Sequence, residues 1–154
     1  MRRVIIESPY SSGTVRPIPE VIERNVRYLR ACLRDCVLRG ETPYASHGLL
    51  TQDGVLRDDV PEERAIGIDA CFAMRRVMDA SVIYTDLGWS SGMRAGKVDA
   101  ELLMLERNRS ALFVPANHPI EERQLGGEWV VCSCNVIAGP GPHHEYRCPM
   151  WRVQ

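Results

Sequence analysis

The segment between residues 80 and 93 combines residue types that could bind and act on a small polar ligand. It reads as a buried strand over 80–86 with Asp86 at its tip, then a turn rich in glycine and serine, then a helix start. In α/β proteins, small polar ligands bind where a strand ends and the next helix begins. The helix start offers unpaired N–H groups and a positive dipole end, which suit a phosphate or a carboxylate. The candidate binding residues here are Gly88, Trp89, Ser90, Ser91, Gly92, Met93 and Arg94.

A second group of candidates follows the first apolar run of the chain, residues 3–8. Glu7 stands at the end of this run, and the expected strand 42–47 ends at His47. Because the ends of parallel strands meet at one sheet edge, these residues are expected near Asp86. His47 could bind a ligand or transfer protons, or it could be a structural or exposed histidine. The further candidates of this group are Ser8, Pro9 and Tyr10.

Some of these candidates have equally simple structural interpretations. Asp86 could contact a ligand, or it could cap the following turn through backbone N–H groups. Trp89 and Tyr10 could stack on a base, or they could fill a sheet edge or an interface. Arg64 stands in the first turn of an expected helix, where the helix dipole disfavours a cation. It could therefore mark an anion site, or it could pair with Glu62, Glu63 or Asp59.

The elements that would position these residues alternate along the chain, which predicts a flavodoxin- or Rossmann-like three-layer α/β fold. The expected strand order is 2-1-3 with further strands at the edge, so the tips of strands one and three meet at a crevice. The last third, rich in proline and glycine, predicts an antiparallel β extension with a hairpin turn at Gly126-Gly127. We expect one domain, 1–154, with a nucleotide-binding core over 1–107 and the extension over 108–154. The expected helices are 19–39, 59–79 and 91–107, and the expected extension strands are 119–125, 128–137 and 145–153.

Composition limits the class of partner. The 154 residues carry a net charge of −1, with 45% hydrophobic and 25% charged residues, as in an ordinary globular domain. Nothing here favours a nucleic-acid polymer or a membrane as partner, and the polar N-terminus does not resemble a signal peptide. We therefore expect a cytoplasmic protein that binds a small molecule.

The cysteines and histidines near the C-terminus leave two interpretations open. Five possible soft ligands could hold a structural zinc ion, or they could belong to a cysteine-rich hairpin. A C-x-C pair on a strand points its thiols to opposite faces, which is poor geometry for one metal. We therefore expect no metal and no cofactor. The residues concerned are Cys132, Cys134, His143, His144 and Cys148.

Several of these segments resemble the nucleoside 2-deoxyribosyltransferase-like group, especially its uncharacterised relatives in phage and bacterial genomes. The matching pieces lie within residues 3–107: 7–10, Asn25, 39–47, 61–68 and 84–93. The resemblance implies a flavodoxin-like sheet, binding of a nucleoside or nucleotide, and often a homo-oligomer. It also implies that a glutamate early in the helix after the third strand attacks the anomeric carbon of the sugar.

This chain departs from that pattern at the expected nucleophile. If Gly96 matches the family glycine, Arg94 stands where the glutamate would be, and no glutamate occurs between Glu63 and Glu101. Either Asp86 or Glu7 then acts as the carboxylate of a hydrolase or transferase, or the pocket binds a nucleotide without catalysis. In the second case Arg94 would suit a phosphate. A third reading is a structural oligomer with a vestigial pocket.

Overall fold

The computed structural model describes residues 1–11, 18–110, 117–126, 130–131 and 137–138. Four strands form one parallel sheet in the order β2-β1-β3-β4, which confirms the predicted α/β fold and the central first strand. The strands are β1 (Arg2–Glu7), β2 (Glu41–Tyr44), β3 (Ala80–Tyr84) and β4 (Ile120–Arg123). The helices are α1 (Pro19–Leu38), α2 (Ser46–Leu49), α3 (Pro61–Arg75) and α4 (Ser91–Ser110).

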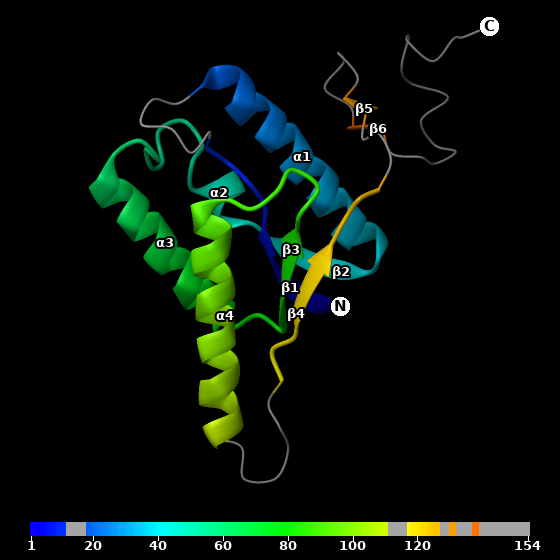
Figure 1. Ribbon diagram of the computed structural model, residues 1–154, viewed down its shortest axis with the longest axis vertical. Helices are drawn as coiled ribbons and strands as arrows, with labels where there is room; N and C mark the ends of the chain where they lie inside the picture. Colours follow the sequence, from blue (N-terminus) through cyan, green and yellow to red (C-terminus); the bar gives the residue numbers. More distant parts are fainter. Residues whose placement is uncertain (12–17, 111–116, 127–129, 132–136, 139–154) are drawn as a thin grey trace, which may run out of the picture.

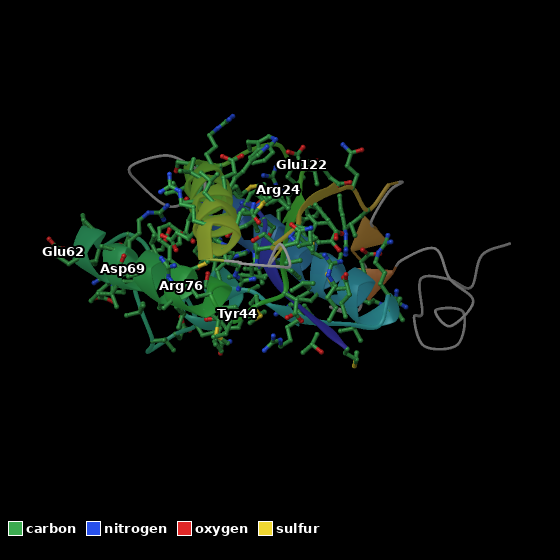
Figure 2. The ribbon with its side chains drawn as sticks, turned by 90° about the horizontal axis from the view of Figure 1, so that it is seen from below. Arg24, Tyr44, Glu62, Asp69, Arg76 and Glu122 are labelled. Carbon is green, nitrogen blue, oxygen red and sulfur yellow. The ribbon has the colours of Figure 1, made fainter. Side chains whose placement is uncertain are left out.

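The sheet lies between two helical layers. Helix α1 covers one face, and α3 and α4 cover the other (Figure 1). Alternate residues of each strand point to opposite faces, so Val4 and Ile6 pack toward α1 while Ile5 packs with Cys71 and Phe72 of α3. Glu62 and Asp69 lie on the solvent-exposed part of α3, and the exposed Arg76 follows its last residue (Figure 2).

The second strand is shorter than its predicted range of 42–47. It ends at Tyr44, and Ser46 and His47 belong to the short helix α2. The chain turns here because Ala45 is extended and its carbonyl accepts hydrogen bonds from the N–H groups of Gly48 and Leu49. His47 still lies beside the end of β1, as expected for the neighbouring parallel strand.

The prediction that residues 119–125 belong to an antiparallel extension is wrong. They contain β4, which pairs in parallel with β3 because the long crossover through α4 returns the chain in the same direction. A separate antiparallel pair joins β5 (Val130–Val131) and β6 (Ile137–Ala138). The predicted strand 145–153 and Gly127 lie outside the described residues.

Helix α4 faces the sheet with a different side from the one its apolar spacing indicates. The pattern Ala95, Val98, Leu102 and Leu105 predicts the inner face, but Val98, Leu102 and Leu105 are each more than half exposed. The buried face instead carries small and apolar residues that allow close approach to the sheet. These residues are Met93, Gly96, Ala100 and Leu103. Among the described residues, no helix is both long enough and apolar enough to cross a membrane.

We expect His118 to make the fold sensitive to acid. The buried imidazole lies 2.9 Å from Ser81 Oγ and 3.3 Å from the Met78 carbonyl, and burial lowers its pKa from 6.5 to about 4. The unfolded chain therefore binds a proton first as the pH falls below 6.5, and the stability contributed by neutral His118 declines toward pH 4. Denaturant titrations at pH 7 and pH 5 measure this decline in the free energy of unfolding. The decline should be smaller in His118→Gln than in the wild-type protein, and an equal decline would contradict the role given to His118.

Candidate functional site

A cavity opens at the carboxyl end of β1, on the face of the sheet covered by α3 and α4. The space between its lining atoms is about 750 Å³, and this volume includes open solvent at the mouth. Its lining combines apolar side chains, here called the apolar wall, with polar groups from β1, α2, α3 and the adjoining loops. The apolar wall contains Leu50, Leu56, Ile68, Phe72 and Met93. The polar lining contains Glu7, Ser8, Tyr10, Ser46, His47, Thr51, Arg57, Asp58, Glu63, Arg64 and Ser90.

Glu7 is the most deeply buried carboxylate of this lining. Its side chain forms an ion pair with Arg75, which is fully excluded from solvent, and only 7% of Glu7 is exposed. Burial raises the pKa of Glu7 from 4.5 to about 7, although the charge and hydrogen bond of Arg75 act in the opposite direction. A carboxyl group with this pKa in a cavity can exchange a proton or act as a nucleophile at neutral pH.

Gly96 provides the space in which the Glu7 carboxylate lies. A Cβ atom at position 96 would lie only 2.3 Å from Glu7 Oε1 and 3.0 Å from Arg75 Nη2. Glycine at this position therefore lets a strand carboxylate lie directly against the backbone of α4. Sequence reasoning used Gly96 only as an alignment landmark and did not identify this role.

Ser8 and His47 form a second polar group in the same cavity. Ser8 Oγ lies 2.8 Å from His47 Nε2, and the ring of Tyr10 packs edge-on to the imidazole at 6.4 Å between centroids. Desolvation lowers the pKa of His47 from 6.5 to about 4, so the imidazole is neutral at pH 7. A neutral imidazole can accept the proton of the Ser8 hydroxyl, which makes the pair a possible proton carrier.

The rim of the cavity carries Arg64 and the start of α4. Arg64 forms an ion pair with a carboxylate, as one of the two interpretations of the sequence has it, but the partner is Asp58 and not one of the three acidic residues named there. An ideal Cβ built on Gly92 would lie 3.9 Å from Arg64 Nη2, so the guanidinium also faces the first turn of α4. Ser91 borders an adjoining outer hollow rather than the inner cavity. The Ser90 hydroxyl accepts a hydrogen bond from the Met93 N–H and thereby caps the helix.

Asp86 lies apart from this cavity, on the α1 face. Its carboxylate accepts a hydrogen bond from the Tyr28 hydroxyl at 2.5 Å and from the backbone N–H of Leu125 at 3.1 Å. Strand alternation explains the separation, because Glu7 is paired in register with Ile83 and Asp86 has the opposite parity. The structure therefore does not bring the two candidate carboxylates together.

Four further candidates are not among the described residues that line the inner cavity: Pro9, Gly88, Trp89 and Arg94. Arg94 lies over the Trp89 ring at 5.7 Å, and Lys97 contacts the same ring. Arg75 was missed, although one signal was available in its spacing. It continues the helical series of Ile68, Cys71 and Phe72, which marks it as an arginine on a buried face.

No cluster of metal-ligating side chains occurs among the residues that the structure describes. Cys132, Cys134, His143, His144 and Cys148, for which zinc was one interpretation, lie outside the described residues.

Substitution of Gly96 by alanine tests whether the site needs this close approach. The new methyl group would displace Glu7 from Arg75, and overpacking of this kind costs about 1–3 kcal/mol in unfolding free energy. Gly67→Ala is the matched control, since it lies on α3 at the same cavity and its nearest neighbour would be Leu56 Cδ1 at 3.5 Å. Denaturant titration should show a loss only for Gly96→Ala. Equal stability of the two variants would mean that the contact is unimportant.

Comparison with known proteins places the chain in a family but assigns no activity to it. Residues 2–108 match the family described as a domain of unknown function, DUF7768, which covers β1 through nearly all of α4. Neither the curated proteins nor the solved structures contain a match. Since the match covers more than half of the sequence, including the elements that build the cavity, the chain belongs to the DUF7768 family.

Proposed function

We propose that the protein binds a nucleoside or nucleotide in the cavity and cleaves or exchanges its N-glycosidic bond, with Glu7 as the nucleophile. The observation that carries this proposal is the buried Glu7 carboxylate, which borders the cavity and lies against α4 at Gly96. The apolar wall suits the face of a base, and the polar lining suits a sugar.

The resemblance noted in the sequence supports this assignment of Glu7. In the transferase-like group the attacking glutamate comes from the early turns of the helix after the third strand. Helix α4 is that helix here, and it has no glutamate before Glu101. Glu7 brings a carboxylate to the same helix from β1, in the space that Gly96 leaves open.

The proposed reaction follows the two steps of a retaining glycosidase. One Glu7 oxygen forms a bond to the anomeric carbon while the bond from that carbon to the base nitrogen breaks. The base leaves with the bonding electron pair and takes up a proton. Water or a second base then attacks the glycosyl ester, loses a proton, and releases Glu7 as a carboxylate. The Ser8–His47 pair lies in the same cavity and could carry these protons.

A second candidate is a protein that binds a nucleotide signal without cleaving it. The ion pair between Glu7 and Arg75 favours this alternative, because a paired carboxylate is a weaker nucleophile. For either candidate we propose a small-molecule partner, a cytoplasmic location and a homo-oligomeric state.

Glu7→Gln distinguishes the two candidates. The wild-type protein is incubated with deoxynucleosides, nucleotides and dinucleotides, and mass spectrometry identifies both the free products and the retained ligands. If Glu7 is the nucleophile, release of free base should fall roughly 10³-fold or more in Glu7→Gln. The control is Glu101→Gln, an exposed position on α4, which should keep full activity. Intact ligand retained by the wild-type protein, with no base released, would instead favour the binding protein.

A further inference from the structure

The Arg75 guanidinium contacts a second carboxylate outside the cavity. Asp99 on α4 accepts a hydrogen bond from Arg75 Nη1 at 2.5 Å, while Arg75 Nη2 contacts Glu7. Asp99 does not line the cavity, and 16% of its side chain is exposed. One buried cation is therefore shared between a carboxylate in the cavity and a carboxylate behind it.

Two carboxylates around one guanidinium leave a surplus negative charge when both are ionised. The surplus is most costly on Glu7, because its side chain is the less exposed of the two, at 9% against 16%. The causes of the raised Glu7 pKa agree with this view. Burial is the largest, and the charge of Asp99 also raises the pKa, while Arg75 lowers it.

The charged groups at the rim of the cavity pair with one another, Arg64 with Asp58 and Arg57 with Asp59. The groups closest to Glu7, apart from Arg75 and Asp99, carry no charge near pH 7. On α3, the Cys71 thiol lies 4.0 Å from Glu7 Oε1, and burial raises its pKa to about 11. On α2, Ser46 is uncharged and His47 is neutral. Ser8, which directly follows β1, carries an uncharged hydroxyl group. Among the described residues that face this carboxyl group, Arg75 and Asp99 therefore decide its charge state.

We propose that Asp99 is a positioning residue that keeps Arg75 paired whenever Glu7 is neutral. A buried guanidinium left without any partner is strongly unfavourable, so Glu7 alone could not easily lose its charge. With Asp99 in contact, Glu7 can take up a proton or become a glycosyl ester without leaving Arg75 uncompensated. The formation of a glycosyl ester rests on the proposed function, whereas the sharing of Arg75 does not.

The test is a carboxyl ¹³C NMR titration of Glu7 in the full chain, with its resonance assigned by its absence in Glu7→Gln. In Asp99→Asn the surplus charge is gone and Arg75 serves Glu7 alone, so the acidity constant of Glu7 should increase about tenfold. Asp69→Asn, an exposed position on α3, is the control and should leave the titration unchanged. An unchanged or weaker acidity of Glu7 in Asp99→Asn would overturn the proposal.

A second variant should change the acidity of Glu7 in the opposite direction. Arg75→Gln removes the cation, so the acidity of Glu7 should decrease, and a merely structural role of the cluster would not produce opposite changes in the two variants. If Arg75→Gln does not fold, the titration of Asp99→Asn decides alone. If Asp99→Asn does not fold, the titration of Arg75→Gln decides, and the proposal is overturned when the acidity of Glu7 does not decrease in that variant.

An activity measurement separates this inference from the proposed function. If nucleosides are cleaved, Asp99→Asn should lower kcat about tenfold or more with little change in KM, and Asp99→Glu should recover part of the loss. Absence of any cleavage by the wild-type protein would reject the glycosidic reaction, while the NMR titration would still decide whether Asp99 and Glu7 share Arg75.

Discussion

The burial of the Arg75 guanidinium is the constraint on which the candidate site depends. A cation excluded from solvent must be paired. Arg75 is the last residue of α3, and its partners are Glu7 of β1 and Asp99 of α4. Breaking such a pair by removing one partner typically costs about 3–5 kcal/mol. The ion pairs therefore hold together three of the elements that line the cavity, β1, α3 and α4, and they require glycine at position 96 so that α4 can approach.

The polar residues at the strand ends serve two different purposes on the two faces of the sheet. On the α3 and α4 face, Glu7 borders the cavity with Ser8 and His47 nearby. On the α1 face, Asp86 accepts a hydrogen bond from the backbone N–H of Leu125. Arg123 of the edge strand β4 forms an ion pair with Glu41 of the opposite edge strand β2. The same residue chemistry thus supports a candidate reaction on one face and the attachment of β4 on the other.

The candidate carboxylates could be found in the sequence, but not told apart. Glu7 and Asp86 each follow an apolar strand, so both are predicted at the same sheet edge. The register that pairs Glu7 with Ile83 gives Asp86 the opposite parity and directs it to the other face. Similarly, α4 has apolar residues on two sides, and the side that faces the sheet is the one that brings Gly96 to Glu7 and Asp99 to Arg75.

Local patterns by themselves determined the alternation of strands and helices and the parallel order of the first three strands. They also determined the end of α1, which stops at Leu38, two residues before Gly40 with its φ of +77°. These features follow from hydrophobic spacing, from glycine's tolerance of positive φ and from the right-handed crossover between parallel strands. Only the tertiary structure decided which carboxylate borders the cavity, that Arg75 is buried beside it, and that β4 joins the parallel sheet. Those outcomes depend on contacts between residues more than 20 positions apart, because charge pairing and close packing are properties of assembled elements rather than of any single segment.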